Sequence, residues 1–200
     1  MENKNTVLSK KDILDAAEKT LRRYGPKKTS VTDVAKELNI SHGTIYRHFP
    51  TKTALKEAVT ERWLEEEIIT PLKQLINADK TDPDQLMKTF ILKLISLKQN
   101  HAANDVEMFE MYAEVTATSI ELVDNHVNGI IEMLSFIIEQ GIQTNIIRKV
   151  NHRDLARSIF YATTKFHHPF HANEWKRGSM SKEFDKVWEL IRGGFKVSKE

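Results

Sequence analysis

The stretch VTDVAKELNISHGTIYRHFP, residues 31–50, holds two short helical patterns separated by a tight corner. Ala35 lies where the first helix must approach the second, and its small side chain permits that contact. Asn39 occupies the corner, where a left-handed backbone is often needed and asparagine tolerates it well. The residues expected to fill the space between the helices are Leu38, Ile45, Val34, Ile40 and Phe49. This spacing predicts a helix-turn-helix, whose second helix enters the major groove of DNA.

The second helix of this pair keeps polar groups on its outer side once Ile45 and Phe49 turn inward. Gly43 removes bulk there, so that the backbone can approach a partner closely. Tyr46 and His48 can donate hydrogen bonds to phosphates, and Arg47 can reach a phosphate or a guanine edge. The alternative interpretation is a helical hairpin with an ordinary polar surface.

The charge of the chain is unevenly distributed. Residues 1–60 carry 12 Lys and Arg against seven Asp and Glu, whereas residues 61–200 carry 18 against 21. A basic front and a mildly acidic remainder indicate that only the front meets a polyanion. Solvated lysines on an ordinary surface are the competing explanation.

The composition is that of a globular protein. The 200 residues are 40% hydrophobic and 29% charged, and none is cysteine, which excludes disulfides and thiolate metal sites. The first residues show no apolar signal core, and no apolar run reaches 18 residues. We therefore expect a cytoplasmic protein that does not enter a membrane.

Helical periodicity dominates the whole chain and predicts an all-α fold of about nine helices. Ser9, Thr32 and Ser41 are candidate N-caps, and Gly25-Pro26 ends the first helix. Pro71 either kinks a long helix over residues 51–76 or begins a new segment. The other helices are expected over residues 9–24, 82–100, 102–118, 119–144, 152–167 and 181–196. We expect an N-terminal DNA-binding domain over residues 1–55 and a larger helical bundle over residues 56–200.

A family resemblance rests on TSVTDVAKELNISHGTIYRHFPTKTAL, residues 29–55. This stretch closely resembles the DNA-binding domain of TetR-like (tetracycline-repressor-like, AcrR-type) transcriptional regulators. The Gly-Thr-Ile-Tyr-x-His-Phe core, residues 43–49, followed by Lys52 and Leu55, is highly specific. The helix over residues 13–25 also resembles the first helix of the family, and the match covers roughly residues 9–60.

The resemblance implies an all-α homodimer that binds a roughly palindromic DNA operator, usually as a repressor, without a cofactor. An unidentified small-molecule effector in the C-terminal domain would release it. Asn39 stands where many members have glycine, and we expect it to keep the same backbone shape. The DNA-facing residues implied by the resemblance are Thr32, Ser41, His42, Gly43, Thr44, Tyr46, Arg47, His48 and Lys52.

The last two helices carry apolar stripes that need a partner. In TetR-like proteins the last two helices of each subunit form a four-helix dimer interface. The residues expected at this interface are Leu155, Ile159, Phe166, Phe184, Trp188 and Ile191. Alternatively, both stripes complete the core of a single subunit.

An effector pocket is expected to be enclosed by the helices over residues 51–76, 82–100, 102–118 and 119–144. Apolar walls with a few polar groups suit such a site. The candidate wall residues are Trp63, Phe90, Met108, Met111, Tyr112, Met133, Phe136 and Phe160. For each of them taken singly, ordinary core packing is the preferred explanation, since methionines fill irregular gaps in any core.

Three histidines, His167, His168 and His171, lie close together with Glu174 nearby. Imidazoles of this density can bind zinc or another divalent metal. However, His168 precedes a proline and should be extended, so the three rings need not converge. We therefore assign no metal site.

Two other classes of function were compared with a DNA-binding regulator. An enzyme on a helical bundle lacks support, because the sequence shows no Gly-rich phosphate loop, nucleophile elbow, Glu-x-x-His pair or thiol. An adaptor whose first domain binds protein is the other alternative. The salt dependence of binding separates these classes, because contacts to several phosphates weaken steeply as salt rises.

Overall fold

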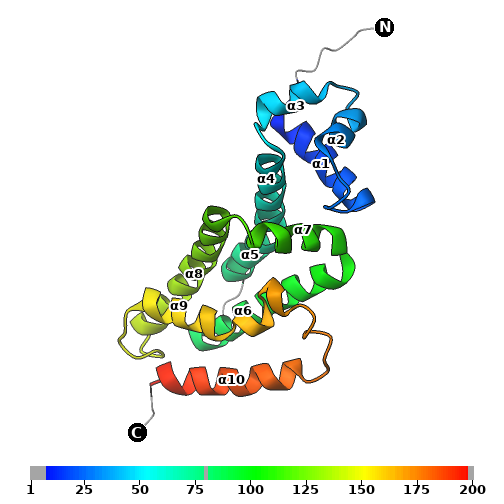
Figure 1. Ribbon diagram of the computed structural model, residues 1–200. Helices are drawn as coiled ribbons and strands as arrows, with labels where there is room; N and C mark the ends of the chain where they lie inside the picture. The colour runs from blue at the N-terminus through cyan, green and yellow to red at the C-terminus, as the bar shows by residue number, and fades with distance from the viewer. Residues whose placement is uncertain (1–7, 79–80, 198–200) are drawn as a thin grey trace. The chain divides into compact units, whose positions relative to one another are not determined.

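The computed structural model describes residues 8–78 and 81–197 (Figure 1). Within these residues the fold is all-α, as predicted, and one isolated bridge joins Ile147 to Lys196. The α-helices are Lys10–Tyr24 (α1), Val31–Glu37 (α2), His42–His48 (α3), Lys52–Leu64 (α4), Thr70–Ala78 (α5), Pro83–Asn104 (α6), Val106–Thr116 (α7), Ile120–Gln143 (α8), His152–Ala162 (α9) and Met180–Phe195 (α10).

The long helix expected over residues 51–76 is divided into α4 and α5 by a π-helical segment, Glu65–Ile69. Pro71 lies two residues after the end of this segment, in the first turn of α5. Proline cannot donate a backbone hydrogen bond, and its ring crowds the preceding turn. The wider π turn accommodates that interruption without ending the helix.

The chain forms two compact units. The first combines the chain up to Trp63 with Asn104–Leu122, and the second combines Leu64–Ala103 with the chain from Val123 onward. The expected division after residue 55 differs from this one, because the first unit continues through most of α4 and also includes α7.

Local capping fixes the helix ends of the first unit. The Ser9 side chain accepts a hydrogen bond from the backbone of Asp12, and Gly25 ends α1 with a φ of 77°. The predicted cap at Thr32 is wrong, because Ser30 caps α2 and the helix already begins at Val31. Ser30 is the better cap, since its hydroxyl and Asp33 satisfy each other's backbone N–H groups.

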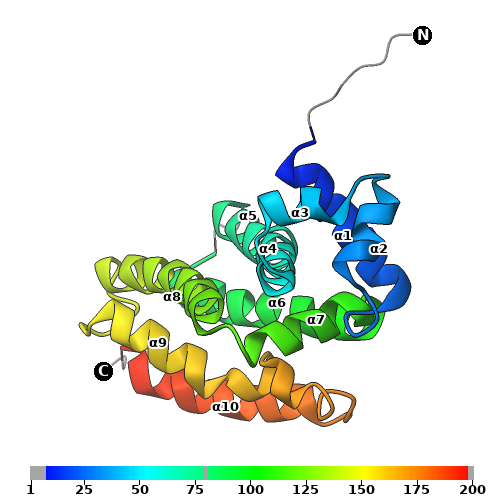
Figure 2. The same cartoon turned by 45° about the horizontal axis from the view of Figure 1, so that its top comes forward.

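The second unit is built around α6, α8, α9 and α10, and α9 runs beside α10 in both views (Figure 2). The helix predicted over residues 152–167 ends at Ala162 and continues as a short 3-10 turn, Thr164–Phe166. No helix in the described part of the chain is long and apolar enough to cross a membrane. The largest fully buried side chains of this unit include Phe90, Leu94, Trp188 and Phe195.

Asp84, in the first turn of α6, is buried against the last turn of α10. Arg192 donates to both of its carboxylate oxygens, at 2.7 to 3.1 Å, and Lys196 donates at 3.0 Å. Burial alone would raise the pKa of Asp84, but these two cations outweigh it and lower that pKa. The negatively charged side chain of Asp84 therefore holds the start of α6 against the end of α10.

We expect Asp84→Asn to lower the free energy of unfolding by about 1–3 kcal/mol, because two cations lose the negative charge and one of the two oxygens that accept their hydrogen bonds. Because the folded-state pKa lies below the unfolded one, the stabilisation by Asp84 should be fully present above about pH 4 and lost as the pH falls further. Urea denaturation at several pH values measures both effects. Asp82→Asn is the control, since the Asp82 side chain caps α6 and asparagine caps equally well, while the charge of Asp82 acts on Arg192 only from a distance and should cost less when it is removed. An equal loss in both variants would contradict the assignment.

Candidate nucleic-acid interface

The corner between α2 and α3 has the backbone shape that the sequence predicts. Asn39 has a φ of 53°, in the left-handed region. The N–H of Ile40 donates to the carbonyl of Ala35, and the N–H of Asn39 donates to that of Lys36. This is the Schellman pattern of hydrogen bonds that closes a helix at a left-handed residue. The prediction for Asn39 is therefore confirmed.

The inner side of α3 is fixed by apolar packing. Ile45, Val34, Ala35 and Phe49 are all buried. Leu38 and Ile40, which were expected in the same core, are only half-buried. Because Ile45 is the buried residue at the centre of α3, its burial sets which side of this short helix faces outward.

The outer side of α3 and its flanks carries the residues implied by the family resemblance. Tyr46 is 41% exposed although it is a large aromatic residue. The segment between Glu37 and Glu57 contains no acidic residue. The exposed members of the set are Thr32, Ser41, His42, Gly43, Tyr46, Arg47 and Lys52, and the half-buried members are Thr44 and His48. The geometry thus provides an outward surface with basic, hydroxyl and aromatic groups and no opposing carboxylate on that segment.

Hydrogen bonds within α3 hold several of these side chains in place. The Ser41 hydroxyl caps the helix by accepting from the N–H of Thr44 and lies 3.0 Å from the Thr44 hydroxyl. Arg47 donates to the same Thr44 oxygen at 3.1 Å. The rings of His42 and Tyr46 meet edge to face, with centroids 6.2 Å apart. A partner would therefore meet side chains that are already oriented.

Gly43 has no packing reason to be glycine. A Cβ atom built there would meet only the Ser41 hydroxyl, at 3.8 Å, and its φ is not in the left-handed region. Glycine inside a helix costs about 0.5–1 kcal/mol relative to alanine. Gly43 therefore lowers the stability of the fold slightly at an exposed position of α3. A glycine is expected at such a position if a partner approaches the backbone of the helix closely.

Gly43→Ala should change stability and DNA affinity in opposite directions. We expect the free energy of unfolding to rise by about 0.5–1 kcal/mol, while the added methyl group weakens DNA binding by about tenfold. Thermal denaturation and an anisotropy titration with labelled DNA measure the two quantities. A variant that binds DNA as tightly as the wild type would show that the backbone of α3 does not approach the partner closely.

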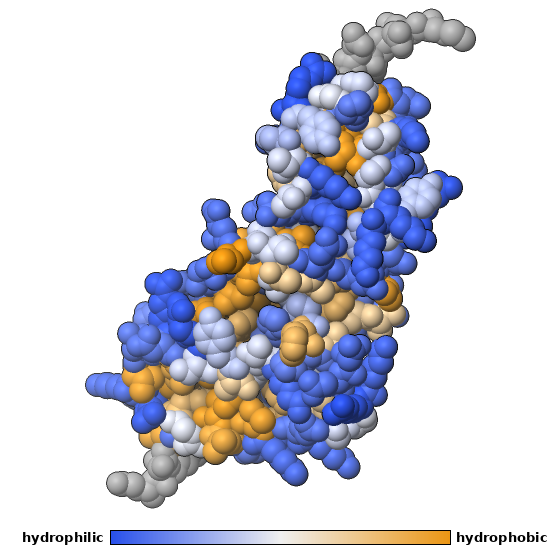
Figure 3. Space-filling view, in the orientation of Figure 1, coloured by the Kyte–Doolittle hydropathy of each residue, from blue (hydrophilic) through white to orange (hydrophobic). Residues whose placement is uncertain are grey.

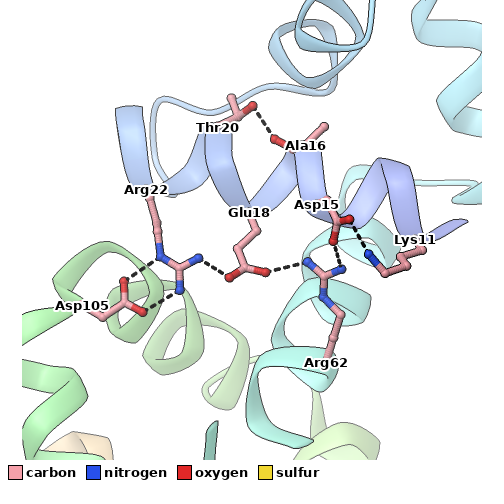
Figure 4. A network of polar contacts seen from close by, with 8 residues as sticks. All are labelled: Lys11, Asp15, Ala16, Glu18, Thr20, Arg22, Arg62 and Asp105. Carbon is pink, nitrogen blue, oxygen red and sulfur yellow. Dashed lines mark hydrogen bonds and ion pairs between the residues drawn. The ribbon is translucent and has the colours of Figure 1, made fainter. Parts of the chain in front are cut away.

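A network of charged side chains joins α1 to α4 and α7 within the first unit (Figure 4). Glu18 lies between two arginines and pairs with both Arg22 and Arg62. Arg22 also donates to both carboxylate oxygens of Asp105, at 2.8 and 3.2 Å. Arg62 reaches Asp15 as well. Because both arginines are shared between acids, the network fixes α1 more firmly than one exposed ion pair would.

Two further contacts join α4 to the region around α7. Lys56 pairs with Glu114 at 2.7 Å, and the Ser119 hydroxyl donates to Glu57 at 2.6 Å. The rings of Trp63 and Tyr112 also lie close, with centroids 5.7 Å apart. These contacts explain why α7 forms one compact unit with α1, α2, α3 and α4.

Four of the six residues predicted at a dimer interface are buried within the single chain. Ile159, Phe166, Phe184 and Trp188 are each no more than 3% exposed. Their side chains pack inside the second unit, with the ring of Phe184 meeting those of Phe166 and Trp188. These four therefore belong to the core, as the alternative interpretation held. The remaining two, Leu155 and Ile191, are half-buried.

Other apolar residues of the same region face solvent instead. Leu190 on α10 is 80% exposed, and Tyr161 on α9 and Phe136 on α8 are more than half exposed. Figure 3 shows apolar side chains gathered on the face that includes α9 and α10. Neither Leu190 nor Tyr161 was among the residues predicted from the sequence to lie at an interface.

The residues predicted to line an effector pocket divide between the two units. Trp63, Met108, Met111 and Tyr112 are buried in the first unit. Phe90 and Phe160 are buried in the second, and Met133 there is half-buried. Phe136, on α8, is more than half exposed. The eight residues thus form no single wall within either unit.

The three neighbouring histidines have separate environments. His167 is buried, with Nε2 3.2 Å from the Thr163 hydroxyl. His168 accepts from the backbone of Phe170, and His171 pairs with Glu174 at 2.8 Å. Among the described residues no group of three or more His, Asp or Glu side chains is arranged to hold a metal ion.

Two parts of the chain match known protein families. Residues 13–59 match the family described as bacterial regulatory proteins, tetR family, and residues 83–188 match the tetracyclin repressor-like C-terminal domain. The chain belongs to the TetR family. It is therefore a DNA-binding transcriptional regulator, and the two matched domains are those of regulators rather than of enzymes.

Individual TetR relatives resemble the chain over most of its length. It is 27% identical to an uncharacterised HTH-type transcriptional regulator, YhgD of Bacillus subtilis, over 70% of this chain and 72% of that protein. It is 21% identical to the nucleoid occlusion factor SlmA of Vibrio campbellii, over 94% and 95%. The transcriptional regulator FadR of Bacillus subtilis, solved in complex with stearoyl-CoA, has the same fold, with a TM-score of 0.64, 22% identity, and 93% and 99% coverage.

Proposed function

We propose that this TetR-family regulator acts as a homodimeric repressor that a small-molecule effector releases from a palindromic operator. The observation that most supports the proposal is the outward surface of α3. Tyr46 and Arg47 are exposed there, on a helix whose other side is buried. The proposed DNA-binding residues are the nine implied by the resemblance. Phosphate contacts would position α3, and base contacts from Arg47 and His42 would select the sequence.

Dimerisation would use the apolar residues that the single chain leaves exposed. Leu190, Tyr161 and Phe136 lie on α10, α9 and α8, the helices of the second unit. Exposed apolar groups of this size mark interaction sites more often than ordinary surface. A two-fold dimer would place two copies of α3 about 34 Å apart, which matches one turn of DNA.

Release by an effector is supported by the likeness to FadR, whose structure contains stearoyl-CoA. The tetracyclin repressor-like C-terminal domain, matched over residues 83–188, covers most of the second unit together with Asn104–Leu122 of the first. We expect a small molecule bound there to shift the dimer toward a state with lower DNA affinity.

Selection of fragments from the source genome by the purified protein tests the proposal. We expect enriched fragments to share an inverted repeat whose half-sites lie about one helical turn apart. A promoter carrying that repeat should be less active when the protein is present. Failure to enrich any fragment, or higher promoter activity with the protein present, would contradict the operator or the repressor assignment respectively.

A further inference from the structure

Three basic side chains meet in the second unit. Lys98 on α6 is only 2% exposed, which is unusual for lysine. Its Nζ atom lies 3.2 Å from Nε2 of His126 on α8. His167, which follows α9, is also buried. Helices α6 and α8 and the segment after α9 thus each contribute one nitrogen base, and the regulatory surface of α3 uses none of them.

The cluster is held in position by its neighbours. The Thr163 hydroxyl lies 3.2 Å from Nε2 of His167, and the ring of Phe160 lies 4.8 Å from that of His167. Gln99, next to Lys98, donates to the backbone carbonyl of Phe166 at 3.1 Å. This bond joins α6 to the turn that carries His167, so the two buried bases keep their relative positions.

Electrostatics oppose charge on all three groups. Burial holds the pKa of Lys98 well below its usual value. Burial, and then Lys98, lower the pKa of His167 to about 3. Burial, and then Lys98 and His167, lower the pKa of His126 as well. An anion placed among them would reverse this balance, because it favours the protonated lysine.

The surroundings of the cluster are apolar. Leu94 lies one helical turn before Lys98 on the buried face of α6, and Ile130 lies one turn after His126 on α8. Of the three residues, His126 is the one that is only half-buried as a whole, although its ring is buried deeply enough to lower its pKa. A molecule with one charged end and an apolar body suits these surroundings.

We propose that Lys98, His126 and His167 bind the anionic head group, a carboxylate or a phosphate, of an otherwise apolar effector. The inference rests on the proposed function, since it assigns the chemistry of the effector. A buried lysine destabilises a fold relative to an apolar residue of similar length. A methionine at position 98 would fill the same space without that cost. Packing alone therefore does not explain why this residue is a lysine.

Calorimetric titration of the full-length protein without DNA tests this site. The probes are undecanoate, decyl phosphate and decanol, which share a decyl chain and differ in head group. We expect at least one of the two anions to bind more tightly than decanol, by about tenfold or more, because charge-assisted hydrogen bonds form only with the anions. Comparison of the two anions distinguishes a carboxylate from a phosphate. If neither anion binds, or if decanol binds equally well, the proposal is overturned.

Lys98→Met removes the charge and keeps the side-chain length. We expect this variant to lose about tenfold or more of its affinity for the anion and to change less than about twofold for decanol. Lys93→Met is the matched control, because Lys93 lies on the same helix but is exposed. The second variant, His126→Phe, removes the histidine and leaves the lysine in place. We expect its affinity for the anion to fall as well. Unchanged anion affinity in both Lys98→Met and His126→Phe would overturn the site.

DNA release is measured separately, so that the two proposals can fail independently. If the anion binds but the protein stays bound to its operator, release by this effector is contradicted, whereas the anion site itself is supported. Operator binding without any anion binding would overturn the anion site and would leave the DNA-binding function standing.

Discussion

Tyr46→Ala should weaken binding to the selected operator by about 100-fold. The side chain is 41% exposed on α3, so its removal costs little packing within the protein. Each dimer would lose two contacts worth about 1.5 kcal/mol each, and the sum corresponds to about 100-fold. Anisotropy titration at one fixed salt concentration measures the change, and circular dichroism verifies that helicity is kept.

Tyr24→Ala is the control for this experiment. Tyr24 is 48% exposed, so the two tyrosines are matched in kind and in exposure, but Tyr24 ends α1 rather than lying on α3. We expect its DNA affinity to stay within about threefold of the wild type, because exposed substitutions away from an interface have small effects. Equal losses in both variants, or wild-type affinity in Tyr46→Ala, would contradict the assignment of α3 as the DNA-binding element.

Leu190→Asp should convert the dimer into monomers. Leu190 is 80% exposed in the single chain, and in a two-fold dimer each subunit would bury one copy. A buried charge at two symmetric positions should weaken association by about 4 kcal/mol or more, which is about 1,000-fold. Sedimentation velocity at micromolar concentration measures the assembly. DNA affinity should fall in parallel, because a monomer contacts only one half-site.

Ile120→Asp provides a matched control for dimerisation. Ile120 begins α8 and is 79% exposed, but it belongs to the first unit. The same substitution there should leave the dimer intact. A wild-type protein that sediments as a monomer, or a Leu190→Asp variant that remains dimeric, would exclude this face as the interface.

The DNA-binding region was largely predictable because its signals are local. The corner at Asn39, the small Ala35 and the buried Ile45 lie within eleven consecutive residues, 35–45, and each is fixed by backbone geometry or helical spacing. The cap at Ser30 was missed in favour of Thr32, although Asp33 three residues later marks a capping box.

The side of α10 that faces solvent was predicted less well, because α10 is apolar on two sides. Trp188 is buried, whereas Leu190 lies two residues later and therefore about 200° around the helix. The sequence shows both residues, but only tertiary packing decides which side completes the core. The larger aromatic side chains Phe184 and Trp188 occupy the interior, and the residues left outside became the candidate contact surface.

The buried basic cluster was not anticipated, although α6 carries a signal for it. Lys98 follows Ile91, Leu94 and Ile95 at helical spacing and so lies on the same buried face. A lysine at such a position usually extends to solvent, which is why the pattern alone does not reveal a buried amine. Contact with His126 and His167 depends on packing between distant parts of the chain and could not be predicted from spacing.

The salt dependence of operator binding by Lys52→Ala tests the central claim most directly. Lys52 begins α4, is exposed, and is proposed to contact a phosphate in each half-site. For the wild type we expect log K to fall steeply with log salt, and Lys52→Ala should reduce the slope by about 1.8, or 0.9 for each lost phosphate contact. Lys149→Ala, an exposed lysine of the second unit, should leave the slope unchanged. A slope in Lys52→Ala equal to that of the wild type would contradict the account.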